Sequence, residues 1–521
     1  MLGKALTLAG TALSAVMVVA IGSGPACAQD GAETIWPTRQ WQTSTPEAQG
    51  MDSAALAGLV DYGATRSFDS LLIARHGRIV LDAYYAPYTA DIPHVVNSIT
   101  KAVIGTLTAI AVHEGLLDSS NHPMLDFFRN RDIANVDDRK RSITVQNLLD
   151  MTSGIEWEEG FEGGREQTLH EFGRAANQIQ FVLDRPMAHA PGEVFYYNSG
   201  NPHLLSAVIT KLTGMIAWDY AKAKLFAPLG IGVSDWRHDA QGLSTGGGGL
   251  ILYPRDLAKI GYLYLRKGRW EDRQLIPPDW ADRPNHAAVN MKASFAADLR
   301  YSNFFWAFPD RHVFMAVGDH CQLMMVFPAL DIVAVATSRN YCSFSKMAND
   351  ISAAVKSDAA LPPNPAGATL LADKIREISI EKPTQVGAAP AIAAAVSGRT
   401  YQFPDNALNV KSLSLDLADA HPHYELELST RDFVNSSRRL AGPIGLDGLY
   451  RMGESTPLGV SALKGTWSNS QTFTIDVRQI GGDSAMDRKW ILSFDGLRLN
   501  LSGKDADGRE ASVDGETTGS N

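Results

Sequence analysis

A serine and a lysine that stand three positions apart, Ser98 and Lys101, could act together as a nucleophile and its base. A serine hydroxyl is a poor nucleophile until a neighbouring base removes its proton. Three residues apart on a helix, two side chains share one face, with their Cβ atoms about 5–6 Å apart. The apolar run AVIGTLTAIAV follows Lys101 and predicts a helix that buries it, which lowers a lysine pKa and makes it a usable base. The alternative interpretation is an ordinary helix start, with a polar serine and a lysine that reaches solvent.

The same spacing occurs three more times, and the surrounding sequence argues against each of the other pairs. None of them is followed by a long apolar helix. They lie at the end of a predicted strand or in and near a predicted β domain: Ser343/Lys346, Ser379/Lys382 and Ser461/Lys464. Context therefore favours Ser98 as the candidate nucleophile.

A further serine, Ser244, matches the Gly-x-Ser-x-Gly pattern in GLSTG. That motif needs a buried strand before the serine and a helix directly after it. Here polar residues precede Ser244, and three more glycines and a strand-like LILY follow. The sequence does not support Ser244 as a nucleophile.

A Tyr-x-Asn element supplies partners for the serine and lysine. Tyr196 and Asn198 lie in a turn before an amphipathic helix, in PGEVFYYNSGNPHLLSAVI. A tyrosine beside Lys101 can relay a proton, and an asparagine can orient the lysine and the substrate. A second Tyr-x-Asn, Tyr301 to Asn303, stands in an aromatic run that resembles a strand, so Tyr196 is preferred.

The elements that must position these residues predict an α/β domain over residues 45–360. Strands are expected within 71–88 and 321–342, on either side of several helices, one of which runs from Ser98 to about Leu116. Residues 361–369, rich in proline, read as a linker. Residues 370–515 alternate with period two and predict a separate all-β barrel or sandwich.

Cys321 and Cys342 stand at the two ends of the hairpin predicted over residues 321–342. Hairpin ends lie close together, so a disulfide is geometrically feasible in an oxidising compartment. Two free thiols are an equally open reading.

Composition and termini narrow the class of protein. The 521 residues are 45% apolar and 20% charged with a net charge of −10, and no basic run indicates a nucleic-acid partner. Residues 1–28 read as a signal peptide cleaved after Ala28, which predicts a periplasmic or secreted protein. No other stretch is apolar and long enough to span a membrane. His-Glu-x-x-His is absent from the sequence, and no metal or other cofactor is expected.

Five segments, in order, resemble the serine β-lactamase-related hydrolases: NSITKAVIG, ITVQNLLDMTSGIEW, PGEVFYYNSGN, GGGGLILYPRDLAKIGYLYL and VGDHCQLMMVFPALDIVAV. This group includes class C β-lactamases, DD-peptidases, family VIII esterases and 6-aminohexanoate-dimer hydrolases. The resemblance covers residues 45–360 and implies an antiparallel sheet flanked by helices plus a helical region. It also implies Ser98 as acylated nucleophile, Lys101 as base and Tyr196 as proton relay, with Asn198 nearby.

The chain departs from this family at the third motif. Where class C enzymes carry Lys-Thr-Gly, the matching segment here ends in Gly318, Asp319 and His320. The resemblance implies that the backbone N–H groups of Ser98 and Asp319 form the oxyanion hole. Because the carboxylate-binding cation is missing, we expect ester or amide hydrolysis of a small-molecule or cell-wall-derived substrate. The alternatives are a β-lactamase or DD-peptidase, and a non-catalytic cell-wall-binding sensor.

Overall fold

The computed structural model describes residues 34–160, 166–232, 235–292, 297–429, 437–456, 459–483, 487–505 and 508–517. Every element described below belongs to one unit of the chain, residues 35–521. The predicted signal peptide and its cleavage site lie outside the described residues. Among the described residues, no helix is long and apolar enough to cross a membrane.

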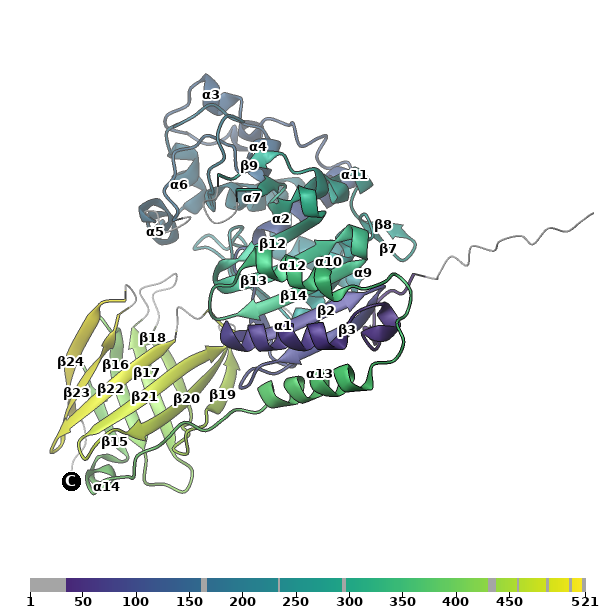
Figure 1. Ribbon diagram of the computed structural model, residues 1–521. Coiled ribbons are helices and arrows are strands. Elements are labelled where there is room, and N and C mark those ends of the chain that lie inside the picture. Colours follow the sequence, from purple (N-terminus) through teal and green to yellow (C-terminus); the bar gives the residue numbers. More distant parts are fainter. Residues whose placement is uncertain are drawn as a thin grey trace, which may run out of the picture. The chain divides into compact units, whose positions relative to one another are not determined.

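A nine-stranded sheet forms the centre of the α/β domain (Figure 1). Its neighbours pair antiparallel except for β1, which runs parallel to β3. The hairpins predicted within 71–88 and 321–342 both form, and β2 pairs with β14, which joins segments from opposite ends of the domain. In sheet order the strands are β1 (Gln42–Thr43), β3 (Arg78–Tyr84), β2 (Phe68–Arg75), β14 (Ile332–Ser338), β13 (Gln322–Phe327), β12 (Val313–Gly318), β11 (Phe305–Phe308), β10 (Arg300–Ser302) and β9 (Val289–Asn290).

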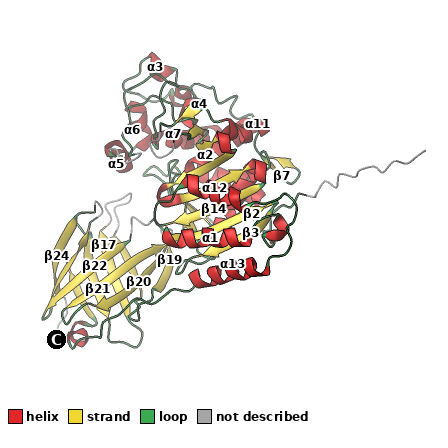
Figure 2. Ribbon diagram, in the orientation of Figure 1, coloured by secondary structure: helices red, strands yellow, loops and turns green. Residues whose placement is uncertain are grey.

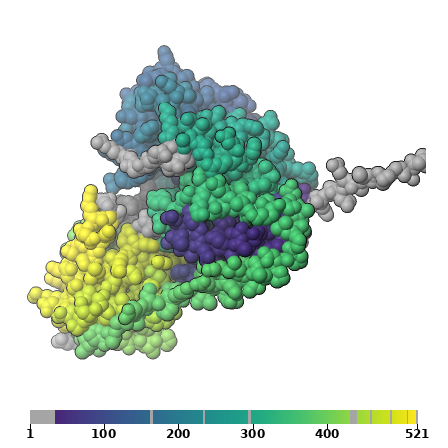
Figure 3. Space-filling view, in the orientation of Figure 1, coloured from purple at the N-terminus to yellow at the C-terminus, as the bar shows by residue number. Residues whose placement is uncertain are grey.

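Helices cover the sheet. Helix α10 (Pro254–Leu265) begins with a proline, as predicted, and contacts β2, β13 and β14. Helix α1 (Ser53–Thr65) contacts β2 and lies between α12 (Phe344–Ala354) and α13 (Pro365–Ile378) (Figure 3). A second, short sheet contains β4 (His94–Val95), β6 (Leu250–Leu252) and β5 (Asp235–Trp236). Its strand β4 ends three residues before Ser98.

A helical region stands next to the sheet and shares helix α2 (Ile99–His113) with it. Helix α2 contacts β12 and β13 of the sheet and α7 (Gly200–Thr213) of the helical region. The other helices here are short: α3 (Asp138–Arg141), α4 (Val145–Leu149), α5 (Gln167–Arg174), α6 (Gln178–Asp184), α8 (Ala217–Ala221), α9 (Ala227–Leu229) and α11 (Pro278–Asp282). Residues from the sheet and from this region share one apolar core.

Residues 365–378, predicted as linker up to residue 369 and as β domain from residue 370, form helix α13. Its Leu371 belongs to the core of the α/β domain, and Lys374 pairs with Asp61 of α1 at 2.9 Å. Pro365 occupies the first turn, where a missing N–H costs nothing. Of the three prolines that suggested a linker, Pro365 therefore starts a helix.

The C-terminal domain is, in its described residues, an antiparallel, nearly closed barrel of ten strands with one short helix, α14 (Ile392–Val396), packed against its core (Figure 2). Its first and last strands in sheet order, β18 and β19, lie next to each other. It has its own core, which includes Trp467, Phe473 and Phe494. The strands are β15 (Arg399–Gln402), β16 (Val410–Asp416), β17 (His423–Ser429), β18 (Ser437–Pro443), β19 (Arg451–Thr456), β20 (Gly459–Trp467), β21 (Thr472–Ile480), β22 (Arg488–Asp495), β23 (Arg498–Lys504) and β24 (Glu510–Thr517).

Candidate active site

Ser98 and Lys101 lie at the start of α2 and touch each other. Ser98 is the residue before the first helical turn, and the Lys101 ammonium donates a hydrogen bond to Ser98 Oγ at 2.8 Å. The preceding residue, Asn97, has a left-handed backbone with φ of +46°, which few side chains other than asparagine tolerate well. The structure thus brings the serine and lysine of the sequence prediction into hydrogen-bond contact.

Burial changes the acid–base behaviour of Lys101. Its side chain is fully buried, and burial lowers its pKa from 10.5 to about 8, although the charge of Glu159 opposes the shift. Besides Ser98, the ammonium donates to the backbone carbonyl of Gly247 at 2.7 Å. Lys101 therefore becomes neutral at a much lower pH than an exposed lysine, while it contacts a hydroxyl.

The tyrosine at this site is Tyr197 and not Tyr196. Tyr197 is partly buried, its ring centroid lies 4.8 Å from the Lys101 ammonium, and its hydroxyl shares a hydrogen bond with Ser98. The side chain of Tyr196 is 43% exposed. Burial raises the pKa of Tyr197 well above its usual value, so this phenol is neutral and can donate a proton. The position of Tyr197, and not that of Tyr196, therefore fits the role of proton relay that the sequence predicted for Tyr196.

Asn198 explains why Tyr197, and not Tyr196, lies beside Lys101. Its side chain is buried, and its Oδ1 accepts hydrogen bonds from the backbone N–H groups of Gly200 and Asn201 at 2.8 and 3.3 Å. Such a turn is a common local use of asparagine, and here it opens α7. Asn198 therefore shapes the backbone that presents Tyr197.

Glu159 is a component of the site that the sequence prediction missed. Its carboxylate accepts hydrogen bonds from the Ser199 N–H and Oγ, both at 2.6 Å, and from Trp157 Nε1 at 2.8 Å. Its charge acts on both Lys101 and Tyr197. No pattern in the acidic segment WEEG marks this residue, because only the fold brings it to α7.

The glycine-rich segment 246–249 supplies the second acceptor for Lys101. A Cβ on Gly246 would lie 2.1 Å from the Pro202 carbonyl oxygen, so only glycine allows this close approach to α7. The Gly246 N–H donates to His203 Nδ1 at 3.2 Å, and His203 Nε2 lies 3.0 Å from a carboxylate oxygen of buried Asp239. These contacts fix the position of the Gly247 carbonyl.

The end of β12 lies against the segment that precedes the nucleophile. A Cβ on Gly318 would meet the Val96 carbonyl oxygen at 2.5 Å, so the absence of a side chain permits this approach. Asn97 Nδ2 donates to the Asp319 carbonyl at 3.2 Å. The structure thus places Gly318 and Asp319 directly beside the residue that precedes Ser98.

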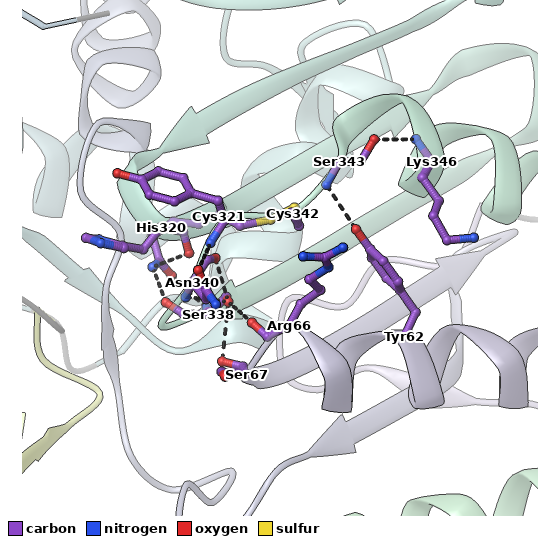
Figure 4. The surroundings of a disulfide bond; sticks show 12 residues. Tyr62, Arg66, Ser67, His320, Cys321, Ser338, Asn340, Cys342, Ser343 and Lys346 are labelled. Atoms are coloured by element: carbon purple, nitrogen blue, oxygen red, sulfur yellow. Dashed lines mark hydrogen bonds between the residues drawn. A yellow bond between two sulfur atoms is a disulfide. The ribbon is translucent and has the colours of Figure 1, made fainter. Parts of the chain in front are cut away.

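A disulfide fixes the corner after Asp319 (Figure 4). Cys321 and Cys342 are bonded, with Cα atoms 5.7 Å apart, so of the two readings of this pair the structure has the disulfide. His320 and Cys321 both have left-handed backbones, with φ of +55° and +60°, which is unfavourable for residues other than glycine. The Tyr341 hydroxyl donates to the Asp319 carboxylate at 3.0 Å. The corner is therefore held by a covalent link and a side-chain contact.

The nearby pair Ser343 and Lys346 has a structural explanation (Figure 4). Ser343 Oγ accepts from the Lys346 backbone N–H at 3.2 Å and caps α12, while the Lys346 ammonium pairs with Asp350 at 2.7 Å. The lysine side chain therefore does not act on the serine.

The remaining candidate serines also have structural partners. Ser379 Oγ donates to a carbonyl at the end of α13, Ser461 pairs with Gln479 inside the barrel, and buried Ser244 accepts from the Trp218 N–H. Within the described ranges, no group of three or more His, Cys, Asp or Glu side chains is arranged to hold a metal ion.

Comparison with known proteins gives a consistent result. The profile of the Beta-lactamase family matches residues 47–351. A 6-aminohexanoate-dimer hydrolase from Paenarthrobacter ureafaciens is 23% identical over 297 residues, which is 52% of this chain and 72% of that protein. A Bacillus anthracis structure provisionally named as a 6-aminohexanoate-dimer hydrolase has a TM-score of 0.50 at 18% identity, over 66% of this chain and 89% of its own. An octameric penicillin-binding protein homologue from Pyrococcus abyssi has a TM-score of 0.47 at 16% identity, over 88% of this chain and 99% of its own.

These matches confirm the predicted fold class. The α/β domain has the fold of the β-lactamases, and the all-β prediction for the C-terminal region resolves as a barrel.

Proposed function

Because the chain belongs to the Beta-lactamase family, whose profile spans more than half of it, we propose that it is a serine hydrolase that forms an acyl-enzyme on Ser98. The observation that carries this proposal is the contact between Lys101 and Ser98 Oγ at 2.8 Å, together with the lowered pKa of the lysine. In its neutral form Lys101 accepts the serine proton while Oγ attacks a carbonyl carbon.

Proton delivery to the leaving group falls to Tyr197 in this proposal. Its neutral phenol contacts Ser98 and faces Lys101, so it can pass a proton to the departing oxygen or nitrogen and recover it from the lysine. Water then attacks the acyl-enzyme with the same groups acting in reverse. Asn198 orients the backbone around this tyrosine.

The oxyanion is assigned to the backbone N–H groups of Ser98 and Asp319. The close approach of Gly318 to Val96 and the bond from Asn97 to the Asp319 carbonyl support this assignment, because they bring the two main-chain segments together. Donors fixed before the reaction stabilise the developing charge without reorganisation.

The substrate class we propose is an ester or amide of a small molecule. The 6-aminohexanoate-dimer hydrolase relative supports an amide, and the absence of a Lys-Thr-Gly motif in the sequence argues against recognition of a β-lactam carboxylate. The bond between Cys321 and Cys342 supports export to an oxidising compartment, as the predicted signal peptide suggests.

Active-site labelling tests this function. A fluorophosphonate should add covalently to the purified protein at Ser98, as found by intact-mass and peptide mass spectrometry. Ser98→Ala should abolish both the label and the hydrolysis of a p-nitrophenyl ester. The matched control is Ser343→Ala, which removes the serine of another Ser-x-x-Lys and should leave both unchanged.

Two outcomes would redirect the proposal. Ester hydrolysis that persists in Ser98→Ala, with no label on the wild type, would refute the serine hydrolase mechanism. A slowly released adduct with penicillin would instead favour the β-lactamase or DD-peptidase alternative.

A further inference from the structure

The C-terminal barrel packs on the part of the α/β domain that leads to Ser98. Tyr88 and Ile92, which precede β4, form an apolar cluster with barrel residues Val460, Ala462 and Ile480. All five are at least 92% buried. Burial of this kind excludes water and favours a fixed contact over a loose tether.

A main-chain hydrogen bond extends this contact toward the nucleophile. The Val95 N–H, three residues before Ser98, donates to the Gly481 carbonyl at 2.7 Å. Gly481 forms the turn after β21 with φ of +72°, and a Cβ there would lie 2.2 Å from the Pro93 carbonyl oxygen. The turn therefore touches the nucleophile segment with its backbone, where no side chain fits.

Arg339 links the same barrel turn to the corner that holds Asp319. Its guanidinium donates to the Gln479 carbonyl at 3.2 Å and forms an ion pair with Asp487, and its side chain is only 9% exposed. Arg339 follows β14 and stands three residues before Cys342, which is bonded to Cys321. The barrel thus contacts the segment before Ser98 directly, and it reaches the corner after Asp319 through Arg339 and the segment that ends in Cys342.

The charge of Asp483, two residues after Gly481, reaches the same region. The pKa of His320 is raised, first by its hydrogen bond to Asp319 and further by the charge of Asp483. Burial, Asp319 and, more weakly, Asp483 raise the pKa of Tyr341 to about 12. The charge of the turn therefore acts on side chains of the corner that follows Asp319.

We propose that the barrel turn 479–483 is a positioning element of the catalytic centre. It sets the relative position of the segment that carries Ser98 and the corner that carries Asp319, which must converge for the oxyanion to be held. The inference rests on the function proposed above for Ser98. It gives the barrel a role in turnover that does not require it to bind a ligand of its own.

A pair of glycine substitutions tests the proposal in the full-length protein. Gly481→Ala introduces the Cβ that meets the Pro93 oxygen. Gly496→Ala is the matched control, because Gly496 also lies in a barrel turn with positive φ, +58°, but has no heavy atom within 4 Å of its would-be Cβ. Both variants place an alanine in a left-handed backbone and share the strain that this causes. The difference between them is therefore the contact with the α/β domain.

The readouts are kcat and KM for a p-nitrophenyl ester and the rate of fluorophosphonate labelling at Ser98. Because small misplacements of catalytic groups cost up to about a hundredfold in rate, Gly481→Ala should lower kcat and labelling at least about tenfold, with KM changed less. Gly496→Ala should stay within about twofold of wild type. Thermal unfolding should report both variants as folded.

A second pair separates strain from the steric contact. Asparagine tolerates a left-handed backbone but still carries a Cβ, so Gly481→Asn should be as impaired as Gly481→Ala, and Gly496→Asn should match wild type. Equal labelling of the Gly481 and Gly496 variants would overturn the positioning role while leaving the hydrolase function intact. A wild type that does not label would refute the hydrolase function itself.

Discussion

The pH dependence of catalysis is the sharpest consequence of a fully buried Lys101. In the mechanism proposed above, Lys101 must be neutral to accept the Ser98 proton, so kcat/KM should be low below the lysine pKa and rise with pH through it. With a pKa of about 8 instead of 10.5, the acid limb should be centred near pH 8. The neutral fraction is then about 9% at pH 7 and about 91% at pH 9, which predicts a roughly tenfold rise in kcat/KM.

Glu159→Gln should move this limb in a defined direction. The carboxylate of Glu159 raises the pKa of Lys101 against the larger effect of burial, so its neutralisation should lower that pKa and shift the limb to lower pH. The matched control is Glu158→Gln, because the charge of Glu158 acts on Tyr196 and is not among the causes of the Lys101 shift.

The assay is initial-rate hydrolysis of a p-nitrophenyl ester from pH 6 to 10, corrected for spontaneous hydrolysis. The position of the limb, and not the plateau, is the readout, because loss of the bonds from Glu159 to Ser199 can also change kcat. A limb near pH 10 in the wild type, or a shift to higher pH in Glu159→Gln, would refute the assignment of Lys101 as base.

Three further predictions concern single residues of the site. Tyr197→Phe should lower kcat by about 10²–10³-fold, whereas Tyr196→Phe, at an exposed position, should change it less than about twofold; the reverse order would return the relay to Tyr196. Cys342→Ser should lower kcat, because it releases the corner after Asp319, and an unchanged kcat would contradict the link between this corner and the site. The substitution should also lower the free energy of unfolding by about 3 kcal/mol, as expected for a disulfide that closes a loop of this length. Denaturant unfolding measures this loss, with dithiothreitol-treated wild type as the comparison. Lys101→Met should abolish activity yet raise the free energy of unfolding at pH 7 by about 1–2 kcal/mol. Burial of the charged lysine, seen in its lowered pKa, destabilises the folded protein by about 3 kcal/mol, and the substitution removes this cost. The loss of the two hydrogen bonds from the ammonium offsets part of that gain. That gain should be full below pH 8 and disappear toward pH 10.5, because the unfolded lysine holds its proton longer than the folded one; a gain that does not depend on pH would argue against this origin.

The parts of the site that the sequence predicted are the local ones. Ser98 and Lys101 share a helix turn, so their spacing alone determines that they meet once α2 forms. The hairpin around residues 328–331 was also predictable, because its two strands and its turn are contiguous.

The parts that sequence reasoning missed depend on tertiary structure. Two adjacent tyrosines point in different directions, and the turn made by Asn198 decides that Tyr197 faces Lys101. Glu159 and the Gly247 carbonyl reach the lysine from segments whose register no short pattern reveals. Helix α13 was hidden by prolines that serve equally well in a linker or in a first helical turn.

The hydrogen bond between Val95 and Gly481 also has a consequence for the order of biosynthesis. A chain emerges from the ribosome N-terminus first, so the nucleophile segment is made long before the barrel turn that contacts it. Contacts between such distant segments form late in folding, because the loop between them must be closed first. Ser98 would therefore gain its full reactivity only after the barrel has been synthesised and has docked. Such a chain would be a latent hydrolase while it is still being made.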